Sequence, residues 1–174
     1  FHNKEHNVFL CKLMDMSASP NAVAAAAAAA NGAGGAESNN SSGNPPAAGD
    51  GAAAAANFTE VAGLSVFNGS AFVADRYNHR IRQVVVSTGE SSTVAGGAAY
   101  GNVDGPTARL NQPMGVAADG SGTLFFVEFW NHNVRKLSLS SSVVTTLAGS
   151  GASGRQDATL GTDAMFNSPQ RIAV

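Results

Sequence analysis

Residues of the types that most often carry chemistry are few in this sequence, and they recur at one spacing. His79 and His132 are separated by 53 residues, and each follows an asparagine. A zinc site needs three or four converging ligands, and no acidic or histidine cluster joins this pair. The sequence also lacks a Ser/His/Asp arrangement at a recognisable spacing and a phosphate-binding glycine loop. It therefore predicts no catalytic residue, no metal site and no cofactor.

The same spacing relates two arginines that we interpret as structural. Arg82 and Arg135 are 53 residues apart, and each lies seven residues after an acid, Asp75 in one copy and Glu128 in the other. We expect an ion pair within each copy that helps to fix packing. Such a pair contributes about 0–1 kcal/mol when it is exposed to solvent.

The Asn-His pairs are also interpreted as structural. Asn78 and Asn131 stand in predicted turns, where asparagine tolerates left-handed backbone and forms local hydrogen bonds. We expect His79 and His132, which follow them, to be buried or to bridge neighbouring units by donating a hydrogen bond to a backbone carbonyl.

The candidate binding residues are Arg76-Tyr77 and Phe129-Trp130, which directly precede the Asn-His pairs. Arginine, tyrosine and tryptophan dominate the energetic hot spots of protein interfaces. Tyr77 and Trp130 occupy the same repeat position, so packing between repeats would explain them equally well. Arg76 and Phe129 differ between the copies, which favours a specific role. We predict that these four residues form a binding surface.

All of these residues belong to a longer internal repeat. Residues 73–82 recur as residues 126–135, and Ala95-Gly96 recurs as Ala148-Gly149. A fixed period of this size indicates stacked supersecondary units. Short β-rich runs separated by turn-forming residues predict four antiparallel strands in each unit. The expected strands are residues 64–67, 71–75, 81–86 and 92–95 in one unit and 115–118, 124–128, 134–139 and 143–147 in the next.

A glycine-rich connection follows each unit and ends in Asn-x-Pro, first at Asn111 and again at Asn167. Residues 170–174 then match residues 114–118, so the sequence predicts that a third unit begins there.

The order of these motifs resembles the NHL repeat. The second copy departs from the pattern at Glu128, where the family prefers Asp, and at Asn133, where it often has Arg. The resemblance covers residues 63–174 and implies a β-propeller in which each repeat is one blade and its first strand lines a central channel. It rests on Val73-Ala74-Asp75, Asn78-His79-Arg80-Ile81-Arg82 and Thr93-Val94-Ala95-Gly96 in the first copy, and on Asn131-His132, Val134-Arg135 and Thr146-Leu147-Ala148-Gly149 in the second.

The expected fold class is all-β, a partial β-propeller of four-stranded antiparallel blades preceded by a disordered low-complexity segment. Propellers usually have four to eight blades, and two blades alone would leave unpaired strand edges. We expect either that the chain is a piece of a longer protein or that several copies assemble a ring. The first alternative is favoured because repeats stabilise one another only when they are stacked.

Composition divides the chain into three segments. Residues 1–16 mix charged and apolar side chains and are compatible with a short helix or the remnant of an upstream region. Residues 17–60 are rich in Ala, Gly, Asn and Ser and are predicted to be a disordered linker. Residues 61–174 are predicted to hold the incomplete propeller. The longest apolar run, residues 22–30, is too short to span a bilayer, and Cys11 has no second cysteine to pair with.

Charge and composition favour a binding module over the alternatives. Residues 63–174 contain eight basic and seven acidic side chains. This part of the chain therefore lacks the strongly basic surface that is typical of nucleic-acid binding. Some related propellers are lyases or lactonases with a metal in the channel, but the predicted innermost strands carry no histidine or acid. We predict a non-catalytic scaffold that binds a protein partner. The alternatives are an RNA-binding propeller and, less favoured, a fragment of a propeller hydrolase or lyase.

Overall fold

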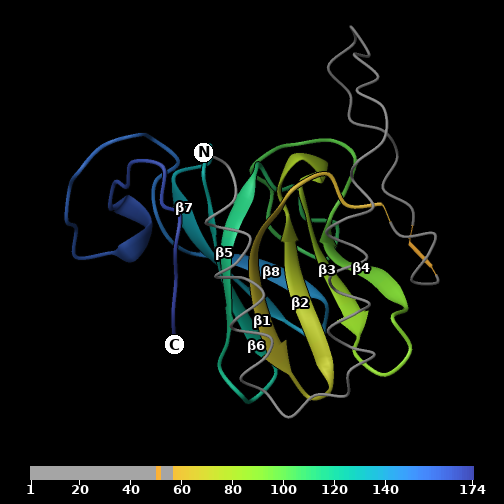
Figure 1. Ribbon diagram of the computed structural model, residues 1–174. Coiled ribbons are helices and arrows are strands. Elements are labelled where there is room, and N and C mark those ends of the chain that lie inside the picture. The colour runs from red at the N-terminus through yellow and green to blue at the C-terminus, as the bar shows by residue number, and fades with distance from the viewer. Residues whose placement is uncertain (1–49, 52–56) are drawn as a thin grey trace, which may run out of the picture.

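The computed structural model describes residues 50–51 and 57–174 (Figure 1). The expectations for residues 1–16, and for residues 17–60 apart from residues 50–51 and 57–60, lie outside the described residues. The described part is all-β and forms two four-stranded antiparallel sheets, each with its strands in chain order. The first sheet holds β1 (Val61–Phe67), β2 (Ser70–Asp75), β3 (Arg80–Val85) and β4 (Ser91–Gly96), and the second holds β5 (Pro113–Ala118), β6 (Thr123–Glu128), β7 (Asn133–Ser138) and β8 (Val143–Ala148). The eight strands expected from the repeat are thereby confirmed.

The turns of the sheets form where the sequence supplies residues that accept left-handed backbone. Asn68 (φ 48°) and Gly69 (φ 72°) connect β1 to β2, as Asn-Gly does in tight hairpins. The corresponding turn of the second sheet is longer, and the Asp119 carboxylate accepts a hydrogen bond from the Ser121 hydroxyl (2.6 Å) and one from the Thr123 amide (2.9 Å). These bonds lower the pKa of Asp119.

The two sheets lie side by side and bury a shared core (Figure 1). Successive residues of a strand point to opposite faces, so Phe72 and Ala74 of β2 join this core while Ala71 and Val73 face the other way. Leu110, from the connection between the sheets, is fully buried in the shared core. The other side chains buried in this core are Ile81, Ala95, Ala108, Val116, Leu124, Phe126, Leu137 and Val144.

Residues before Val61 also contact the first sheet. Gly51 pairs with Ser91 of β4, and Asp50 forms an ion pair with Arg82 of β3 at 2.9 Å. Phe58 is buried in the core cluster on the outer face of β2. These residues therefore pack on the first sheet, although their composition is that of the low-complexity segment.

Within residues 50–51 and 57–174, two single-turn 3-10 helices are present: η1 (Arg76–Asn78) between β2 and β3, and η2 (Gly161–Asp163) in the C-terminal connection. Among the described residues, no helix has the length and apolar character that crossing a membrane would require.

The innermost strands of the two sheets, β1 and β5, approach each other at Gly63. A Cβ atom at this position would overlap the backbone carbonyl oxygen of Met114 and lie 3.0 Å from the Cα atom of Gly115. Backbone atoms cannot move aside as a flexible side chain can, so a side chain here would push the sheets apart.

We predict that Gly63→Ala lowers the free energy of unfolding by about 1–3 kcal/mol, as overpacking usually does. The matched control is Gly97→Ala, because a Cβ atom at Gly97 meets nothing within 4 Å. Urea unfolding followed by tryptophan fluorescence measures both variants. An equal effect of the two substitutions would contradict the close approach of β1 and β5.

Candidate interaction surface

The four predicted binding residues come together from two sheets. Arg76 and Tyr77 lie in η1 after β2, and Phe129 and Trp130 follow β6. The guanidinium carbon of Arg76 lies 4.9 Å from the centre of the Tyr77 ring and 5.3 Å from that of the Phe129 ring. The Phe129 and Trp130 rings meet edge to face, with their centres 5.3 Å apart. We call these four residues the aromatic cluster.

Arg76 connects the members of the aromatic cluster, and its guanidinium is not an exposed charge. Its guanidinium forms an ion pair with Glu60 at 3.0 Å and donates from Nε to the side-chain oxygen of Gln112 at 3.0 Å. With a ring on two sides and these two polar partners, the arginine holds the turns of both sheets together. Sequence reasoning missed Glu60 because it lay in the predicted linker, and Gln112 because it stands in a glycine-rich connection.

The exposed residues of the aromatic cluster are Tyr77 and Trp130, which occupy the same position in the two repeats. Trp130 is 55% and Tyr77 is 40% exposed. Tyr100 is 66% exposed and its ring centre lies 5.6 Å from that of His79, two residues after Tyr77. The sequence analysis did not single out Tyr100, and the only signal was a lone aromatic residue in a glycine-rich connection. Tyr100 therefore lies exposed beside the turn that follows β2.

The histidines bridge consecutive units, but with the opposite hydrogen-bond direction from the one expected. Nδ1 of His79 accepts a hydrogen bond from the Gln112 amide (3.1 Å), and Nδ1 of His132 accepts one from the Ser168 amide (3.0 Å). An acceptor at Nδ1 requires a ring that carries no proton on that atom. Burial lowers the pKa of His79, which is consistent with this neutral form.

The asparagine side chains donate hydrogen bonds to the buried carboxylates, and their backbone is not left-handed. The left-handed residues of these turns are the histidines that follow, His79 (φ 55°) and His132 (φ 51°). Asn78 donates from its side chain to both carboxylate oxygens of Asp75, at 3.0 and 2.9 Å. The side chain of Asn131 donates to one carboxylate oxygen of Glu128 at 2.7 Å.

Each predicted ion pair forms, but it is buried rather than exposed and it has a third member. The Arg135 guanidinium lies 2.5 Å from Glu128 and 2.6 Å from Asp104, and the side chains of Arg135 and Glu128 are fully buried. In the first sheet, Arg82 lies 3.5 Å from Asp75 and 2.9 Å from Asp50. We call each set of one arginine and two acids an arginine clamp. The arginine and the hairpin acid of each clamp are buried, whereas the side chains of Asp50 and Asp104 are partly exposed.

The connections close each clamp with further hydrogen bonds. Arg135 also donates to the backbone carbonyl oxygen of Val103 at 2.9 Å, and Arg82 donates to that of Asn57 at 2.7 Å. The Asn111 amide donates to the Glu128 carboxylate. Phe58 packs on the Arg82 guanidinium, 4.3 Å from ring centre to central carbon.

Burial also changes how the acids of the clamps titrate. It raises the pKa of Glu128 to about 7, against the opposing effect of the Arg135 charge and of the donors Asn111 and Asn131. Burial raises the pKa of Asp75 as well. Arg135 divides its charge between Glu128 and Asp104, so it offsets the effect of burial on Glu128 only in part.

We predict that Glu128 makes the fold more stable as the pH falls from about 8 to about 5. The folded pKa lies above that of the unfolded chain, so the folded state binds the proton more tightly over this range and gains stability on acidification. The check is the free energy of unfolding measured by urea at several pH values for the wild type and for Glu128→Gln. The wild type should gain stability relative to the variant as the pH is lowered, and parallel pH profiles would contradict the raised pKa.

Comparisons with known proteins agree with the repeat. No family model matches the chain. NHL repeat-containing protein 2 from Bos taurus is 31% identical over 133 residues, which cover 68% of this chain and 18% of that protein. Protein SUPPRESSOR OF QUENCHING 1, chloroplastic, from Arabidopsis thaliana is 30% identical over 130 residues, which cover 68% of this chain and 12% of that protein. The chain therefore spans less than a fifth of the length of these relatives.

The fold is shared with solved structures of β-propeller type. An auxiliary nutrient binding protein from Bacteroides thetaiotaomicron matches with a TM-score of 0.55 and 25% sequence identity, over 63% of this chain and 31% of that chain. Each four-stranded sheet described above corresponds to one blade. Residues 63–174 therefore belong to the NHL-repeat β-propeller family and comprise two repeats and the start of a third.

Proposed function

We propose that the two blades form a non-catalytic scaffold module that binds a protein partner through the exposed aromatic side chains Tyr77, Tyr100 and Trp130. The observation that carries this proposal is the aromatic cluster itself, in which Arg76 joins turns from two blades. Exposed aromatic residues in a rigid setting contribute most of the energy of many protein interfaces. A cluster already held in place loses little conformational freedom on binding.

The charges around the aromatic cluster favour a protein partner over RNA. The guanidinium of Arg76 is engaged by Glu60, and the arginines of the clamps are buried and paired with Asp75 and Glu128. RNA binding draws most of its affinity from basic side chains that contact phosphates. The aromatic rings could stack on bases, but Arg76, the basic residue of the aromatic cluster, is already paired with Glu60.

A catalytic role has little support from the strands that would line a channel. The side chains of β1 and β5 include no ionisable group. The one side-chain hydroxyl in β1, that of Ser65, accepts a hydrogen bond from the backbone amide of Ala118 at 3.0 Å. We therefore propose a binding role for this part of the chain.

We predict that Trp130→Ala weakens partner binding at least about tenfold, the usual loss at a hot spot, while the thermal midpoint stays within about 2 °C because the side chain is exposed. The assay selects peptides from a displayed library on the immobilised chain and measures their affinities by fluorescence anisotropy. Leu147→Ala is the matched control, since Leu147 is exposed at 44% and lies in β8, outside the aromatic cluster.

The same assay with single-stranded RNA tests the alternative function. If RNA binds more tightly than any selected peptide, and its affinity falls steeply with salt concentration, the module is an RNA-binding propeller. Equal losses for Trp130→Ala and Leu147→Ala would show that the aromatic cluster is not the binding surface.

A further inference from the structure

The ion pair at the edge of the aromatic cluster exposes its acid more than its base. Oε1 of Glu60 lies 3.0 Å from Nη1 of Arg76, and no described residue donates a hydrogen bond to Oε2 of Glu60. The side chain of Glu60 is 39% exposed, whereas that of Arg76 is 19% exposed. The pair therefore withdraws its positive charge and leaves one carboxylate oxygen available to a ligand.

The position of Glu60 beside the aromatic cluster is fixed by the backbone as well as by the ion pair. The Arg76 amide donates to the Glu60 carbonyl oxygen at 2.9 Å. The guanidinium of Arg76 is in turn held by the rings of Tyr77 and Phe129 and by the side chain of Gln112. The Glu60 carboxylate is thus held at the turn that carries Tyr77.

The rings of this chain already bind cations of the chain itself. The face of an aromatic ring attracts a cation, and tryptophan attracts it most strongly. Arg76 lies over Tyr77 and Phe129, and Arg82 lies over Phe58 at 4.3 Å. Trp130 is 55% exposed, and no cation of the described residues lies over its ring. Its ring is therefore accessible to a cation from a partner.

The arginine clamps show the same polarity as the pair at Glu60. The side chains of Arg82 and Arg135 are fully buried, whereas those of Asp50 and Asp104 are 41% and 49% exposed. In each described ion pair that reaches solvent, the arginine is therefore the more buried partner and the acid is the more exposed one. The charge that these pairs present outward is negative.

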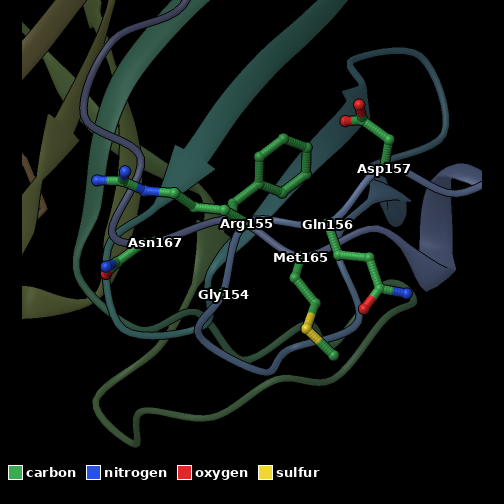
Figure 2. A pocket seen from close by; sticks show the side chains of 7 residues that line it. Gly154, Arg155, Gln156, Asp157, Met165 and Asn167 are labelled. Atoms are coloured by element: carbon green, nitrogen blue, oxygen red, sulfur yellow. The ribbon is translucent and has the colours of Figure 1, made fainter.

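The pocket in the C-terminal connection does not share this polarity. It has a volume of about 430 Å³ and opens between residues 154–157 and 165–167. Figure 2 shows the side chains of Arg155 and Asp157 extending to opposite sides of it. Because both signs of charge line this pocket, it favours neither a cationic nor an anionic ligand.

From the exposed Glu60 carboxylate and the exposed rings we propose that the partner of the aromatic cluster is a basic peptide segment. One lysine or arginine of the segment pairs with Oε2 of Glu60 beside Tyr77, and a second packs on the ring of Trp130. This inference rests on the proposed function, because it names the chemistry of the partner for the same surface.

Other kinds of partner would leave the Glu60 carboxylate in an unfavourable setting. An acidic peptide or a nucleic-acid phosphate would approach a like charge, which is costly at an interface. A segment without polar or basic groups would remove the free oxygen of Glu60 from water without offering it a donor. A basic segment avoids both costs and also gains the attraction of the rings.

The test selects short peptides from a displayed random library on the immobilised full chain and measures their affinities by fluorescence anisotropy. The selected peptides should contain more lysine and arginine than the library does. Replacing these basic residues by glutamine in the selected peptides should weaken binding at least about tenfold at low salt, because it removes one partner of each charge pair.

The matched change in the chain is Glu60→Gln, which keeps an oxygen that can accept from Arg76 but removes the negative charge. It should weaken the basic peptides at least about tenfold, and combining it with the glutamine-substituted peptides should cost little more than either change alone. Glu90→Gln is the control and should leave binding unchanged, because Glu90 is exposed between β3 and β4, at the opposite end of these strands from η1. Thermal midpoints of the variants verify that they are folded.

The outcomes separate this inference from the proposed function. Selected peptides that depend on Trp130 but are neutral or acidic, or basic peptides that bind Glu60→Gln as tightly as the wild type, would overturn the basic partner and leave the protein-binding surface standing. If no selected peptide depends on Trp130, or if single-stranded RNA binds more tightly than the peptides, the proposed function and this inference both fail.

Discussion

A buried arginine held between two carboxylates is the interaction on which the rest of the structure depends. Removing a guanidinium from water is costly unless its donors find acceptors, and Arg135 finds Glu128, Asp104 and the Val103 carbonyl. Only Glu128 belongs to the same sheet hairpin. The other acceptors come from the connection, so the charge is satisfied only when the connection is wrapped onto the blade.

The fixed connection in turn positions the candidate binding surface. The backbone amide of Gln112 donates a hydrogen bond to His79, and the side-chain oxygen of Gln112 accepts one from Arg76. These bonds link the end of the connection to the turn after β2. The guanidinium of Arg76 in turn packs on the ring of Phe129 in the second blade. The exposed rings of Tyr77 and Trp130 are therefore held by a path of hydrogen bonds and ring contacts that leads back to the clamp.

Sequence reasoning was most successful where partners lie close along the chain. The 53-residue period and the turn residues predicted all eight strands, and the pairs Asp75–Arg82 and Glu128–Arg135 form because each spans a single hairpin. Asp50 and Asp104 were missed because 32 and 31 residues separate them from their arginines. Those intervals include irregular chain, so neither period nor pattern points across them. Burial of the pairs was missed for the same reason, since the connections are what cover them.

The four residues of the aromatic cluster were predicted from the sequence, but the contacts that join them were not. The sequence pointed to an aromatic or arginine pair before each Asn-His motif, and the structure joins the two pairs. It could not show that Glu60 neutralises Arg76, because Glu60 lies at the end of a segment whose composition resembles a linker. A low-complexity composition therefore concealed residues that belong to the first blade.

The most direct test of this account is native-state hydrogen exchange of the Asn111 and Gln112 amides, read by NMR. These amides donate to Glu128 and His79 at the end of an irregular connection. If the clamp fastens the connection to the blade, both amides exchange as slowly as the amides of the central strand β6, because they open only when the blade does. Exchange at the rate of an exposed loop would show that the connection opens independently and that the arginine clamp does not organise the fold.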